Sequence, residues 1–449
     1  MDRDFDVICV GAGPCGEAVA AELRGSGLSL AMVEADLVGG ECPYWGCIPS
    51  KTMIRNAETL KEADRARGLA ASRVEYDVDF GKSAQRTLYM ARDLDDSNPA
   101  KAITDGGASL LRGAAAILAA DRVEVDGVAL KARRAVVVAS GSRAAPPPIS
   151  GLDKVDYWTN REAVLARELP GRLAVIGGGA VGVELAQAFA RFGTRVAVLQ
   201  GVERLIPAEE PEAGDLLRKH LERDGITVIT GARVTGVEPG LRVLLEGGQP
   251  VESERLLVAT GRRPNLDGFD LPASGLHTSE RGWLEVEPET LAAGERVWAG
   301  GDVTGIAGFT HVAHYHGTLI GRRLRGQERP ANHVAVPRVT FTDPEVASVG
   351  LTEAQAKAQG INVRVASADA ANSARGYIHD FQDGLVKLVA DLDRRVLVGA
   401  TIVSPRAGEM IHELVLALRA EVPLPVLADT IHAFPTFSRV LQGVLDELR

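Results

Sequence analysis

The hydrophobic and polar positions near the N-terminus predict a strand, a tight turn, a helix and a second strand. The apolar run FDVICV is followed by GAGPCG, by the helical pattern EAVAAELRGSG and by the apolar run LSLAMVEA. Gly11, Gly13 and Gly16 permit a tight turn, close approach of a pyrophosphate to the backbone and close packing of the helix. The helix N-terminus can bind phosphates, and Glu34, at the end of the second strand, can accept hydrogen bonds from a ribose. The segment therefore predicts a dinucleotide-binding unit.

The same pattern occurs a second time. Residues 172–200, RLAVIGGGAVGVELAQAFARFGTRVAVLQ, again combine a strand, a glycine turn, a helix and a strand. Gly177, Gly179 and Gly182 stand where Gly11, Gly13 and Gly16 stand in the first unit. Two such fingerprints predict two dinucleotide folds, so that one cofactor can pass electrons to another.

The rest of the chain predicts helices, a linker and a separate C-terminal domain. Residues 51–100 are polar, charged and helical in pattern, and the prolines at 146–148 indicate a linker. The apolar run before Gly301 and Asp302 delivers an aspartate at a strand end, where it can fix a hydroxyl chain of a cofactor. From about residue 334, short apolar runs alternate with helical patterns at 352–359 and 407–420, which is typical of an antiparallel sheet with helices.

Composition and charge narrow the class of protein. The 449 residues carry a formal net charge of −10, which argues against a nucleic-acid surface, because phosphate binding requires clustered basic charge. No long apolar run and no basic leader with a cleavage site is present, so we expect no membrane segment and a cytoplasmic location. Small molecules are the expected partners.

Two of the four cysteines are expected to form a redox pair. Cys42 and Cys47 are separated by four residues in GGECPYWGCIPSK, and in an ideal helix their Cα atoms would lie roughly 8.6 Å apart. A disulfide needs about 7 Å or less, so Pro43 and Gly46 must distort the first helical turn, giving a strained and easily reduced ring. The Cys pair lacks a second zinc-like Cys or His pair, and we expect no metal. Cys9 is expected in the core and Cys15 in small-residue packing.

At this point the chain resembles the class I pyridine nucleotide-disulfide oxidoreductases, which include dihydrolipoyl dehydrogenase, glutathione reductase and mercuric reductase. The resemblance covers essentially the whole chain, because GAGPCG, the cysteine pair with IPSK, GGGAVGVE, ATGRRPN, GGDVTG and FTDPEVASVGLTE occur in the family order. It implies an α/β fold with two Rossmann-like dinucleotide-binding domains and a C-terminal α+β dimerisation domain. We expect FAD-binding segments at 1–148 and 266–333, an NAD(P)-binding domain at 149–265 and dimerisation through 334–449.

The resemblance also implies roles for single residues. Cys47 would be the sulfur next to the flavin, where it stabilises a thiolate, and Cys42 the interchange sulfur that meets the substrate. Lys51, one turn beyond Cys47, would offer a positive charge near the flavin and pair with Glu184. An ammonium and a helix N-terminus both lower the pKa of a thiol, which agrees with a thiolate at Cys47. The FAD positions are Gly11, Gly13, Gly16, Glu34, Lys51 and Asp302, and the nicotinamide-nucleotide positions are Gly177, Gly179 and Gly182, with Gln200 and Arg204 bearing on the choice of nucleotide. Gly40, Gly141 and Gly261 are further expected cofactor-binding positions.

The C-terminal segment departs from the family pattern. Dihydrolipoyl dehydrogenase and glutathione reductase carry a His and, five residues later, a Glu that act as base and orienter, whereas TIHAFPTFSR places Phe434 and Arg439 there. Histidine supplies roughly 10²–10⁴-fold by proton transfer, so reversible dithiol chemistry on lipoamide or glutathione disulfide is put in doubt. His432 could substitute for the base, or it could be structural.

Three relations within the family also lack that His. Mercuric reductase uses an additional C-terminal cysteine pair, whereas no cysteine follows Cys47 here. The soluble transhydrogenase type lacks an intact cysteine pair. The third, 2-ketopropyl coenzyme M oxidoreductase/carboxylase, shares Phe at the base position and a Cys-Pro at the start of the redox motif, but this chain keeps IPSK and ends soon after Phe434.

Three smaller features leave alternatives open. Gln200 stands where an NADH enzyme often has Glu, and Arg204 is near, which favours NADPH slightly over NADH. Tyr44 and Trp45 either shape an apolar substrate pocket or pack beneath the FAD. His311, His314 and His316 lack the spacing of a metal site and are expected on a helix that caps the flavin.

The expected activity is therefore transfer of electrons from NAD(P)H through FAD to the Cys42–Cys47 disulfide, and on to a small disulfide or thiol-linked substrate. The main alternative is reduction of quinones or similar acceptors, where no histidine is needed. A carboxylase-like reductive cleavage and a redox-sensing flavoprotein without enzymatic activity are the remaining interpretations. A homodimer is expected.

Overall fold

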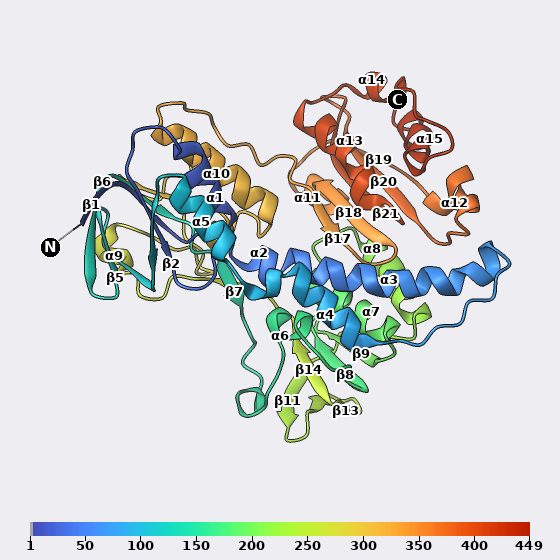
Figure 1. The fold of residues 1–449 in the computed structure, drawn as a ribbon. Coiled ribbons are helices and arrows are strands. Elements are labelled where there is room, and N and C mark those ends of the chain that lie inside the picture. The colour runs from blue at the N-terminus through green and yellow to red at the C-terminus, as the bar shows by residue number, and fades with distance from the viewer. Residues whose placement is uncertain (1–2) are drawn as a thin grey trace. The chain divides into compact units, whose positions relative to one another are not determined.

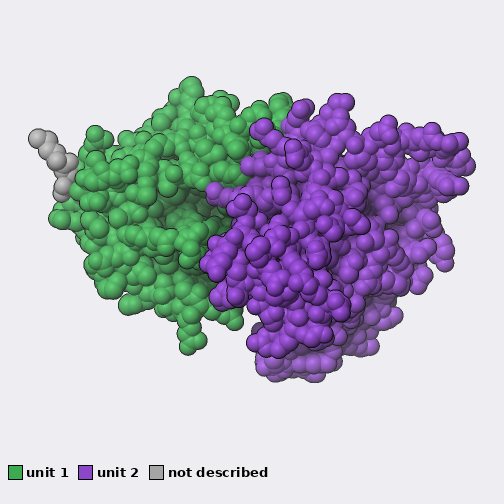
Figure 2. All heavy atoms as spheres, turned by 90° about the horizontal axis from the view of Figure 1, so that it is seen from below, with its two compact units in different colours: residues 1–49, 86–145, 261–332 green, residues 50–85, 146–260, 333–449 purple. Residues whose placement is uncertain are grey.

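The computed structural model describes residues 3–449, which form two compact units coloured separately in Figure 2. Unit 1 comprises the chain up to Pro49 together with Arg86–Ala145 and Gly261–Asn332. Unit 2 comprises Ser50–Gln85, Pro146–Thr260 and His333–Arg449. Helices and strands carry the labels of Figure 1.

Unit 1 is built on a seven-stranded sheet. Its strands are β1 (Arg3–Val10), β2 (Leu30–Glu34), β3 (Ser109–Arg112), β4 (Ala115–Ala119), β5 (Arg122–Val125), β6 (Val128–Val138) and β16 (Val297–Ala299). The order is β3-β2-β1-β6-β5-β4, and β16 also pairs with β6. The strands β1, β2, β3, β6 and β16 are parallel. Val7 and Cys9 of β1 join one core cluster and Ile8 and Val10 another, as expected for a parallel sheet covered on both faces.

Unit 1 also contains helices, a two-stranded ribbon and several short elements. The helix α1 (Pro14–Leu23) begins directly after the first glycine turn, and α10 (Thr310–Leu324) packs along it (Figure 1). A two-stranded ribbon pairs β7 (Ser142–Ala144) with β15 (Arg262–Pro264). The short elements are α2 (Glu41–Tyr44), η1 (Arg92–Leu94), α5 (Ser97–Asp105), α9 (Leu271–Ser274) and η3 (Asp302–Thr304).

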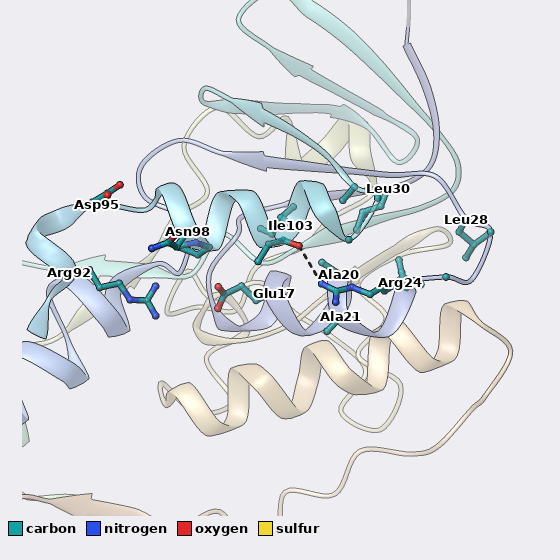
Figure 3. A pocket seen from close by; sticks show the side chains of 18 of the residues that line it. Glu17, Ala20, Ala21, Arg24, Leu28, Leu30, Arg92, Asp95, Asn98 and Ile103 are labelled. Carbon is teal, nitrogen blue, oxygen red and sulfur yellow. Dashed lines mark hydrogen bonds between the residues drawn. The ribbon is translucent and has the colours of Figure 1, made fainter.

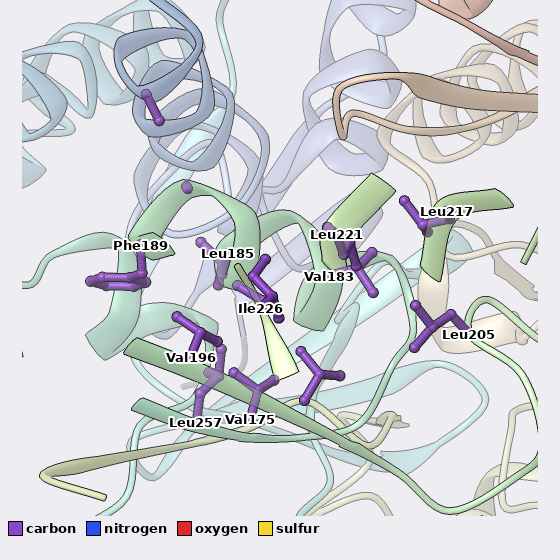
Figure 4. Close-up of a cluster of buried hydrophobic side chains, with 14 of the residues drawn as sticks. Val175, Val183, Leu185, Phe189, Val196, Leu205, Leu217, Leu221, Ile226 and Leu257 are labelled. Atoms are coloured by element: carbon purple, nitrogen blue, oxygen red, sulfur yellow. The ribbon is translucent and has the colours of Figure 1, made fainter. Parts of the chain in front are cut away.

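Unit 2 contains a second parallel sheet. Its strands β8 (Arg172–Ile176), β9 (Arg195–Gln200), β10 (Thr227–Thr230) and β14 (Arg255–Val258) take the order β10-β9-β8-β14. Figure 4 shows the buried cluster in which Leu185 and Phe189 of α7 (Ala180–Arg191) meet Val175, Val196 and Leu257 of the strands. Also present are η2 (Leu152–Lys154), α6 (Asn160–Val164), α8 (Pro211–Arg223) and the antiparallel strands β11 (Val234–Glu238), β12 (Arg242–Leu245) and β13 (Val251–Glu252).

The last part of unit 2 is the expected antiparallel sheet with helices. The strands β17 (Arg338–Thr340), β18 (Glu345–Gly350), β19 (Val363–Ala368), β20 (Leu385–Asp391) and β21 (Val396–Ser404) take the order β17-β18-β21-β20-β19. Helices α11 (Glu353–Ala358) and α13 (Ala407–Arg419) lie where the pattern predicts helices. The others are η4 (Ala370–Asn372), α12 (Ala374–Ile378), α14 (Leu424–Ala428), η5 (Phe437–Arg439) and α15 (Val440–Asp446).

Two helices pass from one unit to the other. The helix α3 (Cys47–Leu69) begins with the last residues of unit 1 and continues in unit 2, and α4 (Phe80–Met90) passes in the opposite direction. The polar helical stretch predicted for 51–100 corresponds to α3, α4 and the start of α5. The prolines at 146–148 lie outside helices and strands, as predicted for a linker.

Candidate active site

The loop between the two cysteines folds back on Glu41. The helix α2 ends at Tyr44, α3 begins at Cys47, and the Glu41 carbonyl oxygen accepts hydrogen bonds from Trp45 N (2.8 Å) and Gly46 N (2.7 Å). A Cβ on Gly46 would lie 3.3 Å from the Cα of Cys42, so glycine permits this close return of the chain. The break in the helix lies at the predicted Gly46, and it brings the two cysteines together as free thiols.

The surroundings of the sulfurs distinguish the two cysteines. The Cys47 Sγ lies 3.2 Å from Thr310 Oγ1 at the first residue of α10, and Cys47 itself begins α3. A hydrogen bond between the two cysteine side chains, together with burial and the negative charge of Cys47, raises the pKa of Cys42 well above its usual value. Cys42 therefore holds its proton strongly, while the position of Cys47 at the N-terminus of α3 is one where a helix can stabilise a thiolate.

Replacing Thr310 with valine should raise the pKa of Cys47 by about one unit, because the hydroxyl that donates to the thiolate is lost. The measurement is the pH dependence of Cys47 alkylation by iodoacetamide in a Cys42→Ser background. Thr318→Val is the matched control, since the Thr318 hydroxyl donates to the His314 carbonyl oxygen further along the same helix. Equal Cys47 pKa values in the two variants would contradict this role.

Lys51 is held by Glu184 and by Phe341 within unit 2. The Lys51 Nζ lies 2.7 Å from Glu184 Oε2, and the Glu184 side chain is only 4% exposed. The other carboxylate oxygen of Glu184 accepts a hydrogen bond from Phe341 N at 2.8 Å, and the Lys51 ammonium lies 4.8 Å from the centre of the Phe341 ring. A carboxylate and an aromatic face thus fix the direction of the ammonium. The sequence did not indicate Phe341.

The first glycine turn has the close contacts that an FAD cradle requires. A Cβ on Gly16 would lie 2.1 Å from the Gly11 carbonyl oxygen, so α1 can approach the turn only with glycine there. No side chain caps the N-terminus of α1 at Gly13, which leaves its N–H groups to a phosphate. Glu34 accepts hydrogen bonds from Ala12 N (2.7 Å) and Asp36 N (2.8 Å), which orients its carboxylate at the end of β2. These residues fit a dinucleotide.

The second glycine turn repeats this arrangement in unit 2. A Cβ on Gly182 would lie 2.0 Å from the Gly177 carbonyl oxygen, while a Cβ on Gly179 would meet no other atom within 4 Å. Gln200 accepts a hydrogen bond from Gly178 N at 2.9 Å, just as Glu34 accepts one from Ala12 N, and donates to the Arg204 carbonyl oxygen at 3.0 Å. The Arg204 guanidinium pairs with Asp215 at 3.2 Å. A neutral amide therefore takes the place of the carboxylate.

Asp302 lies in a network that the sequence reveals only in part. It accepts a hydrogen bond from Ser142 Oγ at 2.7 Å. His316 is fully buried, and its Nδ1 accepts a hydrogen bond from Gly301 N at 3.1 Å, so it supports the turn before Asp302. His311 and His314 are exposed on α10, apart from His316. Among residues 3–449, no group of three or more His, Cys, Asp or Glu side chains is placed to hold a metal ion.

The remaining predicted glycines and cysteines have definite places. Gly40, Gly141 and Gly261 take positive φ values of 67°, 70° and 141°. Cys9 is buried in the core as predicted, and burial raises the pKa of Cys15 to about 12, so that its thiol stays protonated.

The C-terminal segment presents Phe434 to the surface of a single chain. The Phe434 residue is 74% exposed and Ile431 is 95% exposed. The side chain of His432 is 4% exposed, and its Nε2 lies 2.9 Å from Glu413 Oε1. The two neighbours thus differ, since His432 is held within its own subunit and Phe434 is free to meet another chain.

The aromatic pair between the cysteines is buried. Tyr44 is fully buried, with its hydroxyl donating to the Val38 carbonyl oxygen at 2.8 Å, and Trp45 is 8% exposed. Of the two alternatives left open, packing is therefore favoured over a wall of a substrate pocket.

A cavity of about 870 Å³ lies in unit 1 between α1 and the segment around α5 (Figure 3). Glu17, Arg24, Arg92, Asn98 and Ile103 are among its lining residues. It contains none of the cysteines and none of the predicted cofactor-binding residues, so it is separate from the candidate active site.

Comparison with known proteins identifies relatives over the whole length. A family model described as "Pyridine nucleotide-disulphide oxidoreductase" matches residues 5–317, and its dimerisation domain matches residues 336–444. Mercuric reductase of Lysinibacillus sphaericus is 33% identical, covering 98% of this chain and 82% of that protein. Dihydrolipoyl dehydrogenase of Thermus scotoductus is 34% identical, covering 99% and 98%.

Solved structures agree with this. The HOCl-induced flavoprotein disulfide reductase RclA from Escherichia coli is similar with a TM-score of 0.87 at 25% identity, covering 99% of this chain and 100% of that one. A Cu(II) complex of a mutant of that reductase gives a TM-score of 0.88 at 25% identity, with both chains covered in full (100%).

These matches confirm the predicted fold class, with two dinucleotide-binding domains and a dimerisation domain, and the predicted cofactors FAD and NAD(P)H. None of the helices in residues 3–449 has both the length and the apolar character needed to span a membrane. The chain therefore belongs to the pyridine nucleotide-disulphide oxidoreductase family of flavin-dependent enzymes.

Proposed function

We propose that this enzyme is a homodimer that passes two electrons from NAD(P)H through FAD to the Cys42–Cys47 pair and on to a small disulfide or thiol-linked substrate. The observation that carries the proposal is the pair of thiols in the loop that closes on Glu41, with Cys47 beside Thr310 at a helix N-terminus. We assign FAD to 1–148 and 266–333, NAD(P)H to 149–265 and dimer contacts to 334–449. A dithiol reduced by NAD(P)H suits a cytoplasmic location.

The residues of this chain account for the steps at the sulfurs. FAD held by the Gly11–Gly16 turn would supply the two electrons from NAD(P)H that reduce the Cys42–Cys47 disulfide. Cys42, once its thiol proton has passed to solvent, attacks a substrate disulfide, so that a Cys42–substrate bond forms while the substrate S–S bond breaks and releases one thiolate. Cys47 attacks Cys42, which reforms the Cys42–Cys47 bond and releases the second thiolate. Lys51, four residues after Cys47 on α3, adds positive charge that stabilises the Cys47 thiolate.

The lack of a histidine at residue 434 restricts the class of disulfides that the enzyme can reduce. Phe434 of the partner subunit, which stands at the position of the family His, cannot donate a proton to a leaving thiolate. Good substrates therefore release thiolates that are stable without a proton at neutral pH, such as aromatic thiolates of low pKa.

The same observation favours a second candidate function, reduction of an acceptor that releases no thiolate. Quinones belong to this class, and so do soft metal ions. The names of the relatives point to metal ions, since they include mercuric reductases and a reductase solved as a Cu(II) complex. Because no cysteine follows Cys47 in this chain, a metal ion would be reduced here without the additional C-terminal cysteine pair of mercuric reductase. In this class, electrons leave from the flavin or from Cys42 without any protonation by residue 434.

Stopped-flow reduction of the holoenzyme tests these functions. One equivalent of NADPH or NADH should reduce the flavin, and a second spectral phase should follow as the disulfide is reduced. Steady-state rates with lipoamide, an aromatic disulfide, a quinone and Hg²⁺ or Cu²⁺ then rank the acceptors. Faster turnover of lipoamide than of the aromatic disulfide would contradict the role given to Phe434.

The choice of nucleotide should depend on Gln200. In Gln200→Glu, the ratio of kcat/KM for NADPH to that for NADH should fall about tenfold or more, because a carboxylate repels a 2′-phosphate and accepts hydrogen bonds from the ribose diol. Arg204→Met is the control, since it shows how far the positive charge next to Gln200 affects the same ratio. An unchanged ratio in Gln200→Glu would show that residue 200 does not face the ribose.

A further inference from the structure

The Glu41 side chain connects the loop between the two cysteines to Arg262 of strand β15 within unit 1. Glu41 directly precedes Cys42, and its backbone carbonyl oxygen closes the loop by accepting two N–H groups. Its carboxylate is held by Arg262, whose Nη2 donates to Glu41 Oε2 at 2.9 Å. The residue that closes the loop is thus itself fixed by an ion pair from a segment distant in sequence.

Arg262 is fixed in turn by Ser142 across the β7–β15 ribbon. Its Nε donates to Ser142 Oγ at 2.7 Å, and its Nη2 donates to the Ser142 carbonyl oxygen at 2.7 Å. The Ser142 hydroxyl donates to Asp302 Oδ2 at 2.7 Å. The planar guanidinium therefore contacts two segments at once, which a flexible lysine ammonium would do less rigidly.

We propose that Arg262 is a positioning residue that holds the loop between the two cysteines against the hydrogen-bonded Ser142 and Asp302, and so sets the dithiol–disulfide equilibrium of Cys42 and Cys47. Closing a small ring requires the two thiols to be held near each other, and every restraint on the loop raises the effective concentration of one thiol at the other. The Glu41–Arg262 pair is such a restraint, since it fixes the residue next to Cys42. The inference rests on the proposed redox role of the pair.

The test is a thiol–disulfide titration of the holoenzyme in glutathione buffers, in which the protein disulfide and two glutathione molecules exchange with the dithiol and one glutathione disulfide. Arg262→Met should move this equilibrium about tenfold toward the dithiol, which corresponds to about 30 mV in midpoint potential. Arg262→Lys should give an intermediate shift. Arg263→Met is the matched control, because Arg263 is the exposed next residue of the same strand.

A second variant shows whether a shift in Arg262→Met comes from loss of the restraint on the loop or from loss of FAD. Glu41→Gln removes the charge of the ion pair and leaves the Arg262–Ser142–Asp302 contacts in place, so it should also shift the equilibrium toward the dithiol while FAD stays bound. Combining Glu41→Gln with Arg262→Met should add little to the shift of Arg262→Met alone.

Two results would overturn the inference. Equal midpoints for Arg262→Met and Arg263→Met, or an unshifted midpoint in Glu41→Gln, would show that the ion pair does not restrain the sulfurs. If the unchanged enzyme formed no reversible disulfide at all, the proposed function would fail and this inference with it. A normal midpoint in the unchanged enzyme therefore separates the two failures.

Discussion

Replacing Cys42 with serine should lower turnover of small disulfides about a thousandfold or more, because a serine hydroxyl at neutral pH is neither a thiolate nor able to reform the Cys42–Cys47 bond. Flavin reduction by NAD(P)H should continue, since it precedes the disulfide step. Quinone reduction should persist if electrons leave directly from the flavin. The measurements are steady-state rates with each acceptor and the stopped-flow rate of flavin reduction.

The control for this variant is another cysteine of the same unit. Cys9→Ala removes a buried thiol from β1 and should lower the melting temperature while turnover per folded enzyme stays unchanged. Disulfide turnover that survived Cys42→Ser would show that the cysteine pair is not the route of the electrons. Loss of quinone reduction as well would place both acceptors at Cys42.

The parts of the fold that repeat a local pattern were predictable. The two glycine turns, with their flanking strands β1, β2, β8 and β9, correspond to the predicted residues because close contacts at Gly16 and Gly182 can be met only by glycine. An antiparallel sheet with helices from about residue 334 was predicted as well, and its strand β20 is buried throughout. In these elements the local sequence and the tertiary contacts require the same residue types.

The contacts that tune the site could not be predicted from local pattern. Thr310 meets Cys47 across 263 positions of sequence, and Arg262 meets Glu41 across 221. Side chains that meet over such separations leave no periodicity, so only the folded chain reveals them. Tyr44, for which a substrate pocket and packing were both open, is buried in the core with its hydroxyl donating to the Val38 carbonyl oxygen.

Histidine at the family's base position should restore proton transfer. In the double variant Phe434→His and Arg439→Glu, lipoamide or glutathione disulfide reduction should rise at least about tenfold, because a positioned histidine contributes roughly 10²–10⁴-fold and an installed one is less well oriented. Phe434 suits this change because it is 74% exposed in a single chain and is thus available to the partner subunit. The gain should vanish as pH rises well above about 6.5, where the imidazole has lost the proton that it would donate to the leaving thiolate.

The matched control is Phe434→Leu with Arg439→Glu, which alters the same surface but supplies no proton-transfer group. It should leave lipoamide reduction near the rate of the unchanged enzyme. His432 is expected to contribute nothing in either variant, since its ring is buried against Glu413 in its own subunit. Equal rates for the histidine and leucine variants would mean that residue 434 does not reach the sulfurs. The lack of a histidine at residue 434 would then not explain the choice of substrate. Acceptors that release no thiolate would become the favoured substrates.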